Sequence, residues 1–148
     1  MHIGAIFWVA AVAALDQLSK FLAVHFLQLH QPMSVIDGFF RLTLTKNPGG
    51  AFGILSDNSP FITLITAIVG IAILGVLIFV RPQSCYVSSG LILIAGGAFG
   101  NLIDRLRWGY VIDFLDFRVW PVFNVADTAI VLGTALVILA LFSREARE

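Results

Sequence analysis

The sequence predicts an all-α membrane protein with four transmembrane helices and a small β-sheet segment at the membrane surface. Of its 148 residues, 59% are hydrophobic and only 12% are charged, whereas soluble domains are about one quarter charged. Residues 61–80 contain 20 consecutive residues without a charge, and residues 85–103 contain 19 more. A helix of about 20 such residues crosses a hydrocarbon core of about 30 Å. A chain of this length is expected to form one integral membrane domain.

The first helix is expected over residues 3–27, an apolar segment interrupted by Asp16 and Lys20. These two residues are four apart, so they share a helix face and can form an ion pair. An unpaired charge at the bilayer centre costs about 2.5–3.5 kcal/mol on insertion scales, so pairing is favoured. The pair either orients this helix in the bundle or takes a direct part in chemistry, and the spacing leaves both open.

Residues 30–58 are too polar to span a membrane and are expected to form a small sheet on its surface. Residues 40–46 read FRLTLTK, and this alternation of apolar and polar residues is typical of a half-buried strand. The aromatic and aliphatic side chains of Phe39, Phe52 and Ile54 are expected to point toward lipid.

A turn is expected at residues 47–50, which read NPGG. Gly49 and Gly50 allow the backbone to approach another strand or a ligand closely. Asn47 is either a turn residue or an amide that holds a substrate backbone.

The second and third helices are expected over residues 61–80 and 85–104. The loop between them is short, which predicts antiparallel neighbours. Gly96 and Gly100 form a pair of small residues four apart, a spacing that permits close helix contact. The polar end of the third helix and the residues just after it hold Asn101, Asp104, Arg105 and Arg107.

Residues 106–122 are expected to form a loop on the same side as residues 30–58, and their aromatic side chains favour the lipid–water interface. The fourth helix is expected over residues 123–142. Its uncharged part, residues 129–142, has only 14 residues. The helix reaches spanning length only if it carries Asp127 in its first turns.

Four of the seven aspartates lie within the 24 residues from 104 to 127, namely Asp104, Asp113, Asp116 and Asp127. Asp113 and Asp127 flank the start of the fourth helix and can converge at one membrane face. Two carboxyls close together in a medium of low dielectric cannot both ionise, so they share a proton. One can then take a proton from water while the other donates to a carbonyl oxygen, as in aspartic proteases. Alternatively, these acids cap helices or pair with nearby arginines, and spacing does not decide between the two readings.

Other features narrow the class of protein. The formal net charge is zero, so nothing suggests a nucleic-acid partner. The single cysteine, Cys85, excludes an intrachain disulfide and a multi-cysteine metal site. The first segment has no basic region before it and exceeds the length of a signal-peptide core, so it is expected to remain as a helix. No metal or cofactor is indicated.

Three other functions are compatible with charged residues in a small membrane protein. An ion-coupled transporter would place acids near the middle of its spans or show an internal repeat, whereas these acids lie at helix ends. A metal-dependent lipid-headgroup transferase would need several acids at tight spacing to hold Mg²⁺. Asp113 and Asp116 alone are too few carboxylates for such a site. A purely structural membrane protein would leave the polar cluster unexplained.

The chain resembles the bacterial lipoprotein signal peptidase family, signal peptidase II, nearly from end to end. The resemblance rests on five motifs in order: DQLSK at 16–20, NPGGAF at 47–52, GAFGNLIDR at 97–105, VIDF at 111–114 and FNVAD at 123–127. Five such motifs on a four-span chain are specific. The second motif departs slightly, because Gly50 stands where the family usually has alanine and Pro48 occupies a variable position.

The resemblance implies an intramembrane aspartic endopeptidase without a cofactor. Family members remove signal peptides from diacylglyceryl-modified prolipoproteins and cut just before the lipid-bearing cysteine. The motif match makes Asp113 and Asp127 the catalytic pair. It gives supporting or substrate-binding roles to Asn47, Gly49, Asn101, Asp104, Arg105 and Asn124, with Asp16 and Lys20 as further candidates in the first motif. Asp116 falls outside the motifs. The partners implied are the lipid-modified substrate and membrane lipid, and a monomer is expected.

The resemblance also implies a multi-pass protein of the bacterial cytoplasmic (inner) membrane, with both termini in the cytoplasm and an extracytoplasmic sheet. The distribution of cations disagrees with this orientation. Six lie on the loop side: Lys20, Arg41, Lys46, Arg105, Arg107 and Arg118. Only Arg81, Arg144 and Arg147 lie on the other, so the positive-inside rule would place the termini outside. We follow the family, because several loop-side cations have acidic neighbours.

Overall fold

The computed structural model describes residues 2–49 and 59–145. Its helices are α1 (His2–Phe26), α2 (Ser59–Gly75), which continues into the π-helical turn η3 (Val76–Val80), α3 (Cys85–Trp108) and α4 (Val125–Glu145). Its strands are β1 (Met33–Ile36), β2 (Phe40–Asn47) and β3 (Val111–Asp116). The predictions for Gly50, Phe52 and Ile54 concern residues outside these ranges.

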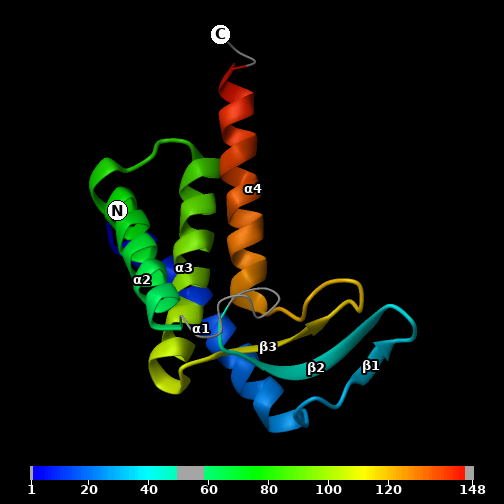
Figure 1. Ribbon diagram of the computed structural model, residues 1–148. Helices are drawn as coiled ribbons and strands as arrows, with labels where there is room; N and C mark the ends of the chain where they lie inside the picture. The colour runs from blue at the N-terminus through cyan, green and yellow to red at the C-terminus, as the bar shows by residue number, and fades with distance from the viewer. Residues whose placement is uncertain (1, 50–58, 146–148) are drawn as a thin grey trace.

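Four helices in the described part of the chain are long and apolar enough to cross a membrane. They extend over Gly4–Phe26, Pro60–Val80, Cys85–Trp108 and Val125–Ser143. The helices stand together as a bundle, and the sheet projects sideways from one end of it (Figure 1). The N-terminus and the outer end of α4 lie away from the sheet (Figure 1). The predicted fold class, four membrane helices with a small sheet, is confirmed.

Helix α3 is the central helix and packs against α1, α2 and α4. Glycines allow this, because a Cβ on Gly97 would lie 2.4 Å from the carbonyl oxygen of Ala126 in α4. A Cβ on Gly100 would lie 2.6 Å from the Oδ2 of Asp16 in α1. The predicted close helix contact at the third helix is therefore confirmed, and it brings the polar ends of three helices together.

The ends of α3 and α4 differ by a few residues from the expected ones. α3 continues to Trp108, so Arg105 and Arg107 lie in its last turn rather than after it. Gly109 closes the helix in the left-handed conformation, with φ of 76°, and donates its N–H to the carbonyl of Arg105. α4 begins at Val125 rather than at residue 123.

The sheet has the order β1-β2-β3, and both pairs are antiparallel. The central strand β2 is the one that the alternating pattern predicted. The expectation that residues 106–122 form only a loop is wrong, because β3 lies within them and pairs Asp113 with Thr45. Both faces of β3 are largely covered, so its residues do not alternate in the way that reveals a strand from the sequence.

The sheet is fixed to the bundle by a small hydrophobic cluster. Ala23 and Leu27 at the end of α1 pack against Leu44 of β2 and Phe114 of β3. Since Phe114 follows Asp113 directly, this cluster sets the position of that carboxyl relative to the helices.

Candidate active site

The two proposed catalytic carboxyls meet where the helices join the sheet. Asp113 lies on β3 and Asp127 in the first turn of α4. Both line one open cavity of about 470 Å³, together with Asn47, Asn101 and Arg105. The expected convergence of these two carboxyls at one site is therefore seen in the structure, and their catalytic role stays a prediction.

Asp113 is only 2% exposed and accepts two side-chain hydrogen bonds. Asn124 donates to its Oδ1 over 2.6 Å, and Asn47 donates to its Oδ2 over 3.0 Å. Burial, and next the negative charge of Asp127, raise the pKa of Asp113 to about 7, although the two amide donors oppose the shift. Asp113 thus titrates near neutral pH, as a carboxyl must if it is to give and take a proton there.

Asp127 is held by the N-terminal cap of α4. Asn124 accepts the backbone N–H of Asp127 at 2.8 Å, and its own backbone N–H points to the Oδ2 of Asp127 at 3.4 Å. This reciprocal pair is a capping box. Asn101 of α3 donates to the Oδ1 of Asp127 over 2.8 Å. The alternative interpretation, a helix-capping aspartate, is thus true of Asp127, and it is compatible with a catalytic role.

Asn124 connects the two carboxyls and is itself completely buried. Besides Asp113, its amide donates to the Oδ1 of Asn101 at 3.1 Å and to the carbonyl of Ile112 at 3.2 Å. These bonds occupy its donors inside the protein, which favours a supporting role over contact with a substrate backbone.

Lys20 is the buried cation beneath this pair, with 2% of its surface exposed. Its ammonium lies 2.8 Å from a carboxylate oxygen of Asp16 and 2.8 Å from one of Asp104. It also donates to the Oδ1 of Asn101 over 2.9 Å. The predicted Asp16–Lys20 pair is confirmed, and Lys20 also orients Asn101 so that its amide group faces Asp127.

The two acids that hold Lys20 also tie backbone segments together. Asp16 accepts the N–H of Ala126 in the first turn of α4 at 2.8 Å. Asp104 accepts the N–H of Ile112 at 3.0 Å, one residue before Asp113. Each acid therefore stabilises the backbone that carries one of the proposed catalytic carboxyls.

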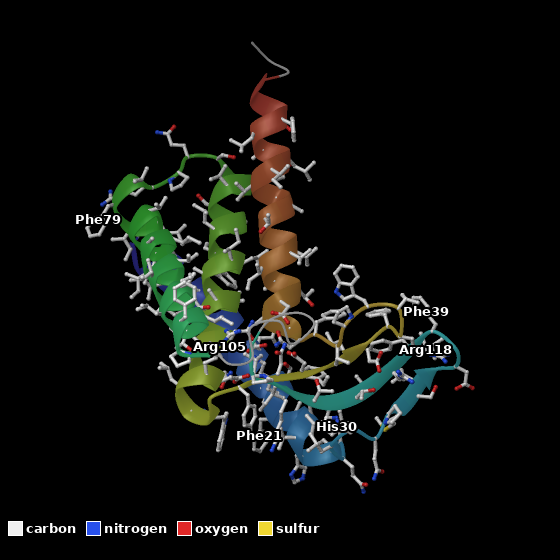
Figure 2. The ribbon with its side chains drawn as sticks, in the orientation of Figure 1. Phe21, His30, Phe39, Phe79, Arg105 and Arg118 are labelled. Atoms are coloured by element: carbon white, nitrogen blue, oxygen red, sulfur yellow. The ribbon has the colours of Figure 1, made fainter. Side chains whose placement is uncertain are left out.

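Arg105 brings a positive charge to the cavity from the last turn of α3 (Figure 2). Its guanidinium lies in the field of Asp127, Asp113 and Asp104. Its Nε is buried and has no hydrogen-bond partner within residues 2–49 and 59–145. An arginine in this position attracts the carboxylates electrostatically.

Asn47 is the last residue of β2 and lines the cavity, and Gly49 follows it by two residues. The Oδ1 of Asn47 accepts the N–H of Gly49 at 3.1 Å, which is a turn contact, while its amide donates to Asp113. Asn47 is thus a turn residue, as one of the two interpretations expected, and its amide is bonded to Asp113 in this structure. The alternative, that this amide holds a substrate backbone, stays a prediction.

Two residues that the sequence interpretation left out belong to the support of the site. Gln17 donates to Asp104 over 2.7 Å. Asp116 is buried and accepts bonds from Arg41 at 2.6 Å and Thr43 at 2.8 Å. Burial would raise the pKa of Asp116, but these bonds and the N–H of Arg118 together hold it below its usual value. Asp116 therefore locks β2 to β3, outside the cavity, and no local sequence signal marks this long-range pairing.

Comparison with known proteins gives the family. Residues 8–143 match the family described as signal peptidase (SPase) II. The chain belongs to the signal peptidase II family. It is 47% identical over 125 residues to the lipoprotein signal peptidase of Moorella thermoacetica, covering 84% of this chain and 83% of the relative. It is 44% identical over 137 residues to that of Halothermothrix orenii, covering 93% and 94%. This establishes a membrane protease that processes prolipoproteins.

Two solved structures share the fold. One, described as a bacterial membrane enzyme structure by the in meso method at 2.3 Å resolution, is 31% identical, with a TM-score of 0.89. It covers 98% of this chain and 91% of the other. A second, at 1.9 Å resolution, is 32% identical, with a TM-score of 0.83 and coverage of 93% and 92%. This chain therefore has the same fold as these two bacterial membrane enzymes.

Proposed function

We propose that this signal peptidase II family member is an intramembrane aspartic endopeptidase that cuts diacylglyceryl-modified prolipoproteins just before the lipid-bearing cysteine. The observation that carries the proposal is the joint placement of Asp113 and Asp127 in one cavity, with the pKa of Asp113 at about 7. Two carboxyls that share a proton near neutral pH are what acid–base hydrolysis of a peptide bond requires.

The reaction uses one water molecule and the shared proton. The ionised carboxyl removes a proton from water, and the water oxygen attacks the carbonyl carbon of the scissile bond. The protonated carboxyl donates its proton to the carbonyl oxygen. The proton taken from water then passes to the leaving nitrogen, the carbon–nitrogen bond breaks, and the re-formed carbonyl returns a proton to the pair. The products are a carboxylic acid on the signal peptide, which then ionises in water, and a free amino group on the lipidated cysteine.

The surrounding residues have distinct roles in this proposal. Asn124 and Asn47 hold Asp113, and Asn101 holds Asp127, so that both carboxyls face the cavity. Arg105 stabilises the negative charge that develops on the carbonyl oxygen. The site lies at a membrane-helix end, where a peptide anchored by lipid can enter sideways from the bilayer.

The proposed location is the bacterial cytoplasmic membrane, with both termini in the cytoplasm. Lys20 and Arg41 form ion pairs with acids, and Arg105 faces the carboxyl pair. These loop-side cations are therefore largely compensated, which supports giving the positive-inside count less weight than the family topology.

The direct test is incubation of the purified protein with a diacylglyceryl-modified prolipoprotein in detergent or vesicles. Cleavage is expected at the bond before the modified cysteine, and excess chelator is expected not to slow it. The same prolipoprotein without its lipid is the control. Cleavage at another bond, or loss of activity with chelator, would contradict the proposal.

A pH profile tests the shared proton. The reaction needs one protonated and one ionised carboxyl, so kcat/KM is expected to fall as pH rises above about 7, where Asp113 loses its proton. The amide of Asn47 lowers this pKa. Asn47→Leu, which removes the donor at similar volume, is therefore expected to move the alkaline limb to higher pH. An unchanged limb, or a move to lower pH, would count against Asp113 as the titrating group.

A further inference from the structure

A nearly apolar groove leaves the active-site cavity along the outer face of α4. Its volume is about 450 Å³, and it is lined by Phe117, Phe123, Thr128, Val131 and Leu132. Val131 and Leu132 are 67% and 55% exposed, and both lie inside the membrane-spanning part of α4. The groove therefore opens toward lipid rather than toward water.

The groove is continuous with the catalytic cavity. Asp127, Trp120 and Phe123 line both. Val131 and Leu132 follow Asp127 by four and five residues, which places them roughly 6–8 Å further along the helix, at about 1.5 Å per residue. A group that begins at the carboxyls can thus extend along α4 without leaving protein surface.

The other walls of the catalytic cavity are poor surfaces for a hydrocarbon chain. They carry the polar groups of Lys46, Asn47, Asn101 and Arg105. Each buried methylene gains about 0.8 kcal/mol only when its new surroundings are apolar. The stacked rings of Phe117 and Phe123, with centroids 5.8 Å apart, meet this condition on the α4 side.

We propose that this groove binds the acyl chains of the substrate's diacylglyceryl group. The inference rests on the proposed function, because there the lipid is attached to the residue that follows the scissile bond and so begins beside the carboxyls. The cysteine side of the bond then lies over α4, and the signal-peptide side lies toward the end of β2.

A second apolar hollow provides a comparison. It has a volume of about 320 Å³ and is lined by Val24, Leu29, Leu44, Lys46, Trp108, Tyr110 and Ile112. Lys46 also lines the catalytic cavity, so the two spaces share one polar side chain. Leu44 precedes Thr45 on β2 and so points to the opposite face of the sheet. Neither Asp113 nor Asp127 lines this hollow, so a chain attached at the scissile bond would not enter it directly.

The first test uses two matched valines that are both exposed on membrane helices. Val131→Trp fills the groove, and Val24→Trp fills the second hollow. With a dihexadecanoyl substrate, Val131→Trp is expected to raise KM about tenfold, equivalent to about 1.4 kcal/mol. With a diacetyl substrate it should change KM less than about twofold, because acetyl groups are too short to extend along the groove to Val131. Val24→Trp should leave both values near wild type. Equal effects of Val131→Trp on both substrates, or the same chain-length effect from Val24→Trp, would overturn the assignment.

The second test does not depend on cleavage. A lipopeptide with photoreactive acyl chains is bound to the intact protein and to the Asp113→Asn variant, and the labelled residues are mapped. Labelling within residues 117–132 is expected in both. Uniform labelling of all lipid-facing helices would contradict the proposal that this groove binds the acyl chains. So would labelling of residues 117–132 by a photoreactive phosphatidylglycerol that the lipopeptide does not displace, since the groove would then hold bulk lipid. Absence of cleavage by the wild type would instead overturn the proposed function.

Discussion

Asp113→Asn and Asp127→Asn are each expected to abolish cleavage of a lipidated prolipoprotein, with a loss of at least about 10³-fold. Either change removes an acid or base from the pair, so water is no longer activated and the carbonyl oxygen is no longer protonated. The amide is similar in size to the carboxyl, and the partners Asn47, Asn101 and Asn124 remain. The protein should therefore stay folded and inserted.

The measurement is product formation by the purified variants, compared with their thermal unfolding in detergent. Asp37→Asn is a suitable control, because Asp37 is exposed, accepts a hydrogen bond from the hydroxyl of Ser34, and does not line the cavity. It should retain wild-type activity. Full activity in either Asp113→Asn or Asp127→Asn would disprove the catalytic pair.

Lys20→Met is expected to destabilise the fold by about 3–5 kcal/mol, the usual cost of removing one partner of a buried ion pair. Asp16 has no exposed surface and Asp104 is 1% exposed, so their carboxyls would remain buried without the cation. Asn101 would also lose the donor that orients its amide toward Asp127. Activity should fall together with stability.

A neutral triple variant separates charge from packing. Lys20→Met combined with Asp16→Asn and Asp104→Asn removes the uncompensated charge, and it should recover most of the lost stability. Lys46→Met is the matched control for the measurement of unfolding, because Lys46 is exposed and lies over the ring of Tyr110, a contact worth about 1 kcal/mol or less. A triple variant no more stable than Lys20→Met would contradict this account.

The sequence allowed prediction of those elements whose signal is local. Uninterrupted apolar runs located the membrane helices, and strict alternation located β2. The Asp16–Lys20 pair could be predicted because both residues lie on one helix turn. β3 could not be predicted in this way, since it is covered on both faces and its hydrogen bonds go to a strand about 70 residues earlier, as Thr45 with Asp113 shows.

The residues of the candidate site could be predicted from the sequence, but the hydrogen bonds that connect them could not. The motif resemblance, rather than physical reasoning from spacing, selected Asp113 and Asp127. The contacts that give each neighbour its role are long-range: Lys20 with Asn101, and Gln17 with Asp104. Side-chain hydrogen bonds between different helices depend on how the helices pack. That packing cannot be predicted from the residue pattern of a single sequence.

The hydrogen bond from the backbone of Ala126 to Asp16 joins residues 110 positions apart in the chain. During synthesis α1 emerges first. Among residues 2–49 and 59–145, Lys20 pairs with Asp16 on its own helix and with Asp104 of α3, which is made later. The last partner of Asp16 comes with the first turn of α4, the same turn that carries Asp127. A nascent chain that lacks α4 therefore lacks Asp127, so the proposed catalytic pair can form only when the final helix has entered the bilayer.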